Sequence, residues 1–251
     1  MSEVELSILL PAFIAGLLVL ATHIPFGMKI LERGVIFADL AVAQIAGMGV
    51  IFAALLDLTE KPLAVQLIAA TSALCGAALL AWIEKRMAEV KEACIGLTFI
   101  LAASGGILLM SRDVHAGEHL KDLLVGQILW VSTNQLIATA ILTVVLLALW
   151  QWGKTRVHYL GFYALFALAV TASVQLVGVY LVFASLIVPA LATWRIKQRR
   201  SIVAFAIGIA GYAIGLLLSA WLDLPSGAAV VWAMAVTGVL VALLLNTRKV
   251  G

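Results

Sequence analysis

Long apolar segments follow one another along almost the whole chain, with only short polar breaks between them. Nine such segments can be delimited, at 6–26, 35–56, 63–83, 93–110, 133–152, 159–177, 179–194, 202–221 and 226–246. A helix that crosses the hydrocarbon core of a bilayer needs about 20 mainly apolar residues. The sequence therefore predicts an all-α fold, a polytopic membrane helix bundle of eight to nine spans that forms one transmembrane domain over residues 1–251.

The composition agrees with a chain that is surrounded by lipid. Hydrophobic residues make up 64% and charged residues 12% of the sequence, whereas soluble domains carry about 25% charged residues. Glu3 and Glu5 make the first residues acidic, while a cleaved signal peptide begins with a basic region, so we expect a permanent span from Leu6 onward. Cys75 and Cys94 are isolated in apolar segments, and we expect them to form neither a disulfide nor a zinc finger.

Two places leave the path of the chain open to interpretation. The apolar run from Tyr159 to Trp194 would make a straight helix of about 54 Å, which exceeds the hydrocarbon thickness of about 30 Å. We therefore expect it to fold back at Val177-Gly178. The apolar stretch 123–132 either re-enters the membrane or extends the next span, and this leaves the number of spans at eight or nine.

The basic residues predict the orientation of the chain in the membrane. With the N-terminus outside and nine crossings, 13 of the 16 Lys and Arg residues fall in loops on the inner side. The outer loops hold Lys61, Arg112 and Lys121, together with eight acidic residues. Because Lys and Arg accumulate on the cytoplasmic side of membrane proteins, we expect an outside N-terminus and a cytoplasmic C-terminus.

Asp39 is the one acidic residue that falls within a predicted span. A carboxylate at membrane depth is costly, and such residues usually face a partner or a water-filled path. Asp39 is therefore a candidate ligand for a cation, although a carboxyl group near the interface could also bind to neighbouring helix ends. Gln44 is five positions further on and about 140° around the helix, so it is a weak candidate and better explained as a hydrogen-bonding partner between helices.

One predicted outer loop holds the residue types that bind metal ions. Asp113, His115, Glu118 and His119 lie within seven residues, and imidazole with carboxylate suits zinc or manganese. The same residues could equally form a solvated polar loop, so both interpretations stay open. The remaining histidines, His23 before Ile24-Pro25 at an expected helix end and His158 in a basic inner loop, are predicted to be structural.

Other classes of function lack a signal in the sequence. It contains no Gly-rich loop of Walker type, no nucleophile elbow and no zinc-protease helix. An intramembrane enzyme would need paired catalytic residues at membrane depth, where Asp39 is the only acid. We therefore expect neither an enzyme nor a nucleic-acid-binding protein.

Five segments resemble the permease subunits of bacterial ABC-type importers of zinc, manganese and iron. They are LERGVIFADLAVA at 31–43, Ile95-Gly96, LVGQILWVS at 124–132, VGVYLVFASLIVPALAT at 177–193, and Ser219 with Asp223-Leu-Pro-Ser-Gly227. The segments around Pro189 and Asp223 are the most specific, and the resemblance covers nearly the whole chain.

This resemblance implies a membrane permease that moves a divalent metal, zinc or manganese, and needs no cofactor. It also implies a homodimer that encloses one path in the bacterial inner membrane. Two cytoplasmic ATP-binding subunits and an extracytoplasmic metal-binding protein would be its partners.

The sequence departs from the pattern of that family in two respects. The family places a His four residues after the Asp, as a candidate metal pair, whereas Ala43 stands at that position here. The family also has about twenty more inner residues between the fifth and sixth spans, with a helix that docks on the ATPase, whereas Gly153 to His158 is all that this chain has. Coupling would then use another loop, such as Glu84–Glu92 or Arg195–Ser201. Alternatively, the chain works without an ATPase, as a channel, secondary carrier or accessory subunit.

Overall fold

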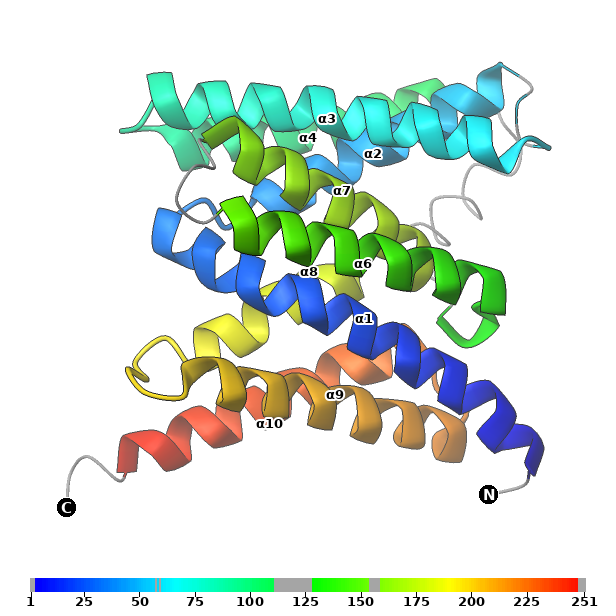
Figure 1. The fold of residues 1–251 in the computed structure, drawn as a ribbon, viewed down its shortest axis with the longest axis vertical. Helices are drawn as coiled ribbons and strands as arrows, with labels where there is room; N and C mark the ends of the chain where they lie inside the picture. The colour runs from blue at the N-terminus through cyan, green and yellow to red at the C-terminus, as the bar shows by residue number, and fades with distance from the viewer. Residues whose placement is uncertain (1–2, 57, 59, 111–127, 154–158, 248–251) are drawn as a thin grey trace. The chain divides into compact units, whose positions relative to one another are not determined.

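The computed structural model describes residues 3–153, except 57, 59 and 111–127, and residues 159–247, and every regular element within these ranges is helical. The elements are α1 (Glu3–Arg33), α2 (Ala38–Leu55), α3 (Pro62–Arg86), α4 (Lys91–Met110), the 3₁₀ turn η1 (Ile128–Trp130), α6 (Thr133–Gly153), α7 (Tyr159–Val177), α8 (Val179–Ala192), α9 (Arg200–Leu222) and α10 (Ser226–Thr247) (Figure 1). Each of the nine predicted apolar segments thus forms a helix, and the all-α prediction is confirmed.

Seven of the described helices are long and apolar enough to cross a membrane, namely α1, α2, α3, α6, α7, α9 and α10. α8 has 14 residues and is about 21 Å long, so it is too short to cross the whole hydrocarbon core of about 30 Å. Large apolar side chains face outward along these helices, and tryptophans such as Trp152 and Trp221 are 83% and 81% exposed. Such a surface suits lipid, with tryptophans near the helix ends at the interface.

α1 is longer than its apolar segment predicted. His23 was expected at a helix end before Pro25, and this was wrong, because the helix continues through Pro25 to Arg33. A proline removes one intrahelical hydrogen bond, and in a membrane bundle neighbouring helices compensate for such a loss. Phe26 and Ile30 are buried beyond the proline, so packing holds the last two turns in the helix.

The chain divides into two compact units. The first contains α1, η1, the beginning of α6, α8, α9 and α10, as residues 1–33, 124–144 and 176–251. Its helices approach closely at glycines. A side-chain carbon at Gly208 would lie 2.6 Å from Leu20 of α1, and one at Gly211 would lie 2.7 Å from Met234 of α10. α9 therefore packs between α1 and α10 at distances that only a residue without a side chain permits.

The second unit holds residues 34–123 and 145–175, including α2, α3, α4 and most of α7. α2 packs against both α3 and α4 (Figure 1). Gly49 of α2 faces Ser72 of α3, at 2.6 Å from an added side-chain carbon, and Gly76 of α3 faces Ile45 at 2.7 Å. α2 therefore lies between α3 and α4 in this group, and Asp39 is in its first turn.

The predicted corner at Val177-Gly178 is confirmed. α7 ends at Val177, α8 begins at Val179, and Gly178 between them has φ +80°, a conformation that glycine adopts without steric cost. Residues 128–132, the described part of the stretch 123–132, do not continue α6, because that helix begins at Thr133 and is preceded by the separate turn η1. η1 packs on α1, and its Ile128 is buried.

Candidate cation site

Asp39 lies in the first turn of α2, and its side chain is fully buried. The backbone reaches this turn through Gly34, which has φ +64°, and the Ala38 N–H donates a hydrogen bond to the Val35 carbonyl at 3.1 Å. Among the described residues, no hydrogen-bond donor meets either carboxylate oxygen of Asp39. The alternative that Asp39 bonds to neighbouring helix ends therefore has no support in the described part of the chain.

Glu92 of α4 holds the beginning of α2 in place. Its Oε1 accepts a hydrogen bond from the backbone N–H of Phe37 at 3.1 Å, and Phe37 is the residue that precedes α2. The second oxygen, Oε2, is buried and meets no donor within the described ranges. Two carboxyl groups, from Asp39 and Glu92, thus stand at the N-terminal end of one helix.

The sequence interpretation missed Glu92, which it assigned to an inner loop. The structure places Glu92 in the first turn of α4, which begins at Lys91. The available signal was an acidic residue directly before the apolar run Ala93-Cys94-Ile95, a pattern typical of a helix N-terminus.

This arrangement suits the binding of a cation better than any covalent chemistry. A buried carboxylate without donors is destabilising, and the positive end of the α2 dipole offsets part of that cost. A cation bound by the open oxygens would offset more. No group of three or more His, Cys, Asp or Glu residues comes together in the part of the chain that the structure describes. Within the described residues, Asp39 is thus not part of a cluster of three or more such side chains.

The other candidate residues in α2 add little to Asp39. Ala43, at the position of the expected His, is buried and offers no ligand atom. Gln44 is half-buried and faces a different direction around the helix. Asp113, His115, Glu118, His119 and His158 lie outside the described residues.

His23 is a fully buried residue of α1. Its Nδ1 lies 3.0 Å from the Val19 carbonyl oxygen and 3.0 Å from Thr22 Oγ1. Because a carbonyl oxygen only accepts, we assign the ring proton to Nδ1. Nε2 has no hydrogen-bond partner among the described residues. The bond to the helix backbone supports the predicted structural role.

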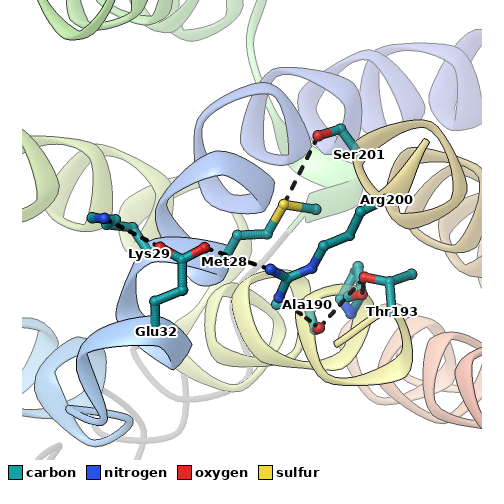
Figure 2. A network of polar contacts seen from close by, with 8 residues as sticks. Met28, Lys29, Glu32, Ala190, Thr193, Arg200 and Ser201 are labelled. Carbon is teal, nitrogen blue, oxygen red and sulfur yellow. Dashed lines mark hydrogen bonds and ion pairs between the residues drawn. The ribbon is translucent and has the colours of Figure 1, made fainter. Parts of the chain in front are cut away.

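A polar network joins α1, α8 and α9 at one end of the first unit (Figure 2). Glu32 of α1 forms ion pairs with Lys29 at 3.1 Å and with Arg200 of α9 at 3.6 Å. Arg200 Nη2 also donates to the Ala190 carbonyl of α8 at 3.4 Å, and Thr193 Oγ1 donates to the Pro189 carbonyl at 2.7 Å. The link from α1 to α9 was not predicted, because Glu32 and Arg200 lie far apart in the sequence.

The Ser219–Gly227 segment forms the tight connection from α9 to α10. Asp223 ends α9 with φ 52°, and its backbone N–H donates to the Ser219 carbonyl. Ser219 Oγ donates to the Leu224 carbonyl at 2.7 Å. The motif is therefore explained by the turn that it builds.

The family model that matches the chain is the ABC 3 transport family, over residues 5–156 and 153–246. The chain is 27% identical over 170 residues to a probable iron transport system membrane protein of Haemophilus influenzae, covering 59% of this chain and 62% of that one. It is 32% identical over 189 residues to the chelated iron transport system membrane protein YfeD of Yersinia pestis, covering 66% and 63%. The alignments thus span less than two thirds of these relatives.

A solved structure has the same fold. PsaBC from Streptococcus pneumoniae, in complex with Fab, matches with a TM-score of 0.68 over 93% of this chain and 89% of that chain, at 20% sequence identity. The family match takes in nearly all of the helices described above, including the start of α2 with Asp39 and the α9–α10 turn. The chain is a multi-pass membrane protein that belongs to the ABC 3 transport family.

Proposed function

We propose that this chain is the permease subunit of an ABC-type importer of a divalent transition metal. The observation that carries the proposal is the buried carboxylate of Asp39, whose two oxygens meet no donor among the described residues. In a membrane protein of a transport family, such a group is best explained as part of a cation path. The chain supplies the path and performs no covalent reaction.

The atoms that the candidate side chains offer favour some transported metals over others. Carboxylate oxygens suit manganese and iron(II), while imidazole nitrogens add affinity for zinc. Ala43 leaves α2 without an imidazole beside Asp39, and two relatives are named for iron transport. Manganese and iron(II) are therefore favoured over zinc at this position, and zinc remains a candidate through the histidines of the outer loop.

The proposed assembly is a homodimer in the bacterial inner membrane, with the N-terminus outside and the C-terminus in the cytoplasm. Cytoplasmic ATP-binding subunits would drive it, and an extracytoplasmic metal-binding protein would deliver the ion to the outer face. Asp113, His115, Glu118 and His119 on that face are the proposed receiving site. The basic residues on the inner side support this orientation.

A second candidate function is that of a permease-derived protein that works without an ATPase. It is favoured by the short connection between α6, which ends at Gly153, and α7, which begins at Tyr159. The two parts of the family match also meet there, at residues 153–156. Little chain is left at that point for a partner to bind.

Reconstitution in liposomes separates the two candidates. The tagged chain is purified from its native membrane with any bound subunits, and uptake of radiolabelled manganese, iron(II) and zinc is measured with and without ATP. We expect uptake that requires ATP and an accompanying ATP-binding chain. Uptake by the isolated chain, unchanged by ATP, would instead establish the second candidate.

A further inference from the structure

The connection between α8 and α9, residues 193–199, is the most basic of the described connections. It carries Arg195, Lys197 and Arg199, Arg200 follows directly, and no acidic residue lies among them. The α3–α4 connection at 87–90, on the same side in the proposed orientation, carries the acidic Glu89 and no basic residue. The α1–α2 connection at 34–37 carries no charge at all. We call residues 193–199 the α8–α9 loop.

Both ends of the α8–α9 loop are anchored (Figure 2). At its start, Thr193 is buried and its hydroxyl donates to the Pro189 carbonyl at 2.7 Å. At its end, Arg200 reaches back to the Ala190 carbonyl at 3.4 Å and to Glu32 at 3.6 Å, and Ser201 Oγ lies 3.9 Å from Met28 Sδ of α1. The loop is therefore connected to the ends of three helices and is not a freely moving tether.

The middle of the loop is exposed. Lys197, Gln198 and Arg199 are exposed, and Arg199 has φ 57°, which turns the chain sharply into α9. Arg195 stacks over the ring of Trp194 at 5.0 Å. The result is a fixed turn with a basic tip.

The network also leads along the chain to the candidate cation site. Glu32, which binds Arg200, is followed by Arg33 and by Gly34 with φ +64°. Asp39 lies five residues beyond that glycine, in the first turn of α2. If docking displaced the α8–α9 loop, the Arg200–Glu32 ion pair would carry that displacement to the end of α1.

We propose that the α8–α9 loop is the surface on which an acidic patch of a cytoplasmic ATP-binding subunit docks, and that Arg200–Glu32 transmits its movement to α1. This inference rests on the proposed function and names the surface that the partner uses. Basic residues at a protein interface attract a partner of opposite charge and fix its orientation. The loop is also the described inner connection that reaches three helix ends at once.

Anionic lipid headgroups are the other partner that a basic loop attracts. Lipid binding requires charge near the membrane surface and no defined shape. The buried hydroxyl of Thr193 and the left-handed Arg199 give this loop a defined shape. A protein surface is thus the occupant that the geometry favours.

Photo-crosslinking in native cells tests the docking. A benzophenone side chain is placed singly at Gln198, at Glu89 in the α3–α4 connection, at position 155 between α6 and α7, and at Lys61 on the proposed outer side. Adducts are labelled with azido-ATP to identify chains that bind ATP. We expect a labelled adduct from position 198 and none from position 61.

The outcomes separate this inference from the proposed function. A labelled adduct from position 89 or 155, with none from 198, would overturn the docking surface and leave the ATP-driven permease standing. A lipid-sized adduct alone at 198, with a labelled chain captured elsewhere, would do the same. No ATP-labelled adduct from any position would refute both.

A charge-reversal pair provides the second readout. Lys197→Glu with Arg199→Glu should reduce the amount of ATP-binding chain that co-purifies by about tenfold or more, because like charges would then face each other. Lys85→Glu with Arg86→Glu, at the end of α3, is the matched control and should leave co-purification unchanged. Equal losses in both variants, at equal membrane levels, would contradict the proposal.

Discussion

At the scale of single residues, Asp39 is the proposed cation ligand, and its buried carboxylate meets no donor among the described residues. Asp39→Asn keeps the volume of the residue and removes its charge, so the helices should pack as before while the cation loses its ligand. We expect metal uptake to fall by about tenfold or more, the size of effect that the loss of a metal-orienting group produces. Uptake of labelled manganese and iron(II) in cells, normalised to the amount of chain in the membrane, measures this.

Glu92→Gln is the control for that variant. A glutamine oxygen can still accept the bond from the Phe37 N–H, which Glu92 Oε1 accepts at 3.1 Å. The start of α2 should therefore stay in place, and the loss of uptake should be smaller than for Asp39→Asn. If Asp39→Asn supports normal uptake, Asp39 has a structural role and the cation path lies elsewhere.

The two carboxyl groups differ in how far the sequence could predict them. Asp39 is visible because it interrupts an apolar segment with a charge. Glu92 does not stand out in the sequence, because it is the last residue of a segment rich in charged residues that begins at Glu84. Only the packing of α4 on α2 shows that its oxygen accepts a hydrogen bond from Phe37. The Glu32–Arg200 pair is harder still, since a charge pair between distant segments leaves no local pattern.

At the scale of the elements, close helix packing leads to a sharp prediction at Gly27 of α1. A side-chain carbon there would collide with the backbone carbonyl of Leu186 in α8. Gly27→Ala should lower the stability of the folded protein by about 1–3 kcal/mol, as overpacking of a fitted core does. The midpoint of thermal unfolding in detergent would fall accordingly.

Gly47 in α2 is the matched control. Nothing lies within 4 Å of a carbon added at that position, and alanine is favoured over glycine inside a helix by about 0.5–1 kcal/mol. Gly47→Ala should therefore leave the midpoint unchanged or raise it. Equal midpoints for the two variants would show that α1 and α8 do not meet at Gly27.

The helices were predictable from their apolar segments, and their ends were less so. The break at Gly178 was predictable, because a single straight helix over the two apolar segments that flank it would be longer than the membrane is thick. Pro25 suggested a break that does not occur, because Phe26 and Ile30 are buried past it. Whether a proline ends a helix thus depends on the packing of the residues that follow, and an isolated segment does not contain that information.

At the scale of the whole molecule, the distribution of basic residues predicts the orientation. In a background with Cys75→Ala and Cys94→Ala, single cysteines at positions 118 and 198 are treated with a reagent that cannot cross the membrane. We expect labelling of intact cells at 118 and labelling at 198 only after the membrane is opened. The reverse pattern would place the N-terminus in the cytoplasm.

The charge of the outer face supports the last prediction. The proposed outer loops carry three basic and eight acidic residues, and a negative surface raises the local concentration of cations. His115 and His119 would add neutral imidazoles that bind metal at pH 7.5 and lose this ability as they gain protons toward pH 5.5. A receiving site of this kind matters when the ion is scarce, because at high concentration the path fills without it.

We therefore expect His115→Ala with His119→Ala to weaken uptake most at low metal concentration and little at saturation. The difference from wild type should shrink at pH 5.5, where the wild-type imidazoles are protonated as well. Uptake of labelled zinc and manganese against concentration, at pH 7.5 and 5.5, measures both effects. Zinc should respond more than manganese, since imidazole nitrogen suits zinc better. Identical curves for the double variant and wild type would mean that the loop is a solvated turn, and the path would then begin at another group of the outer face.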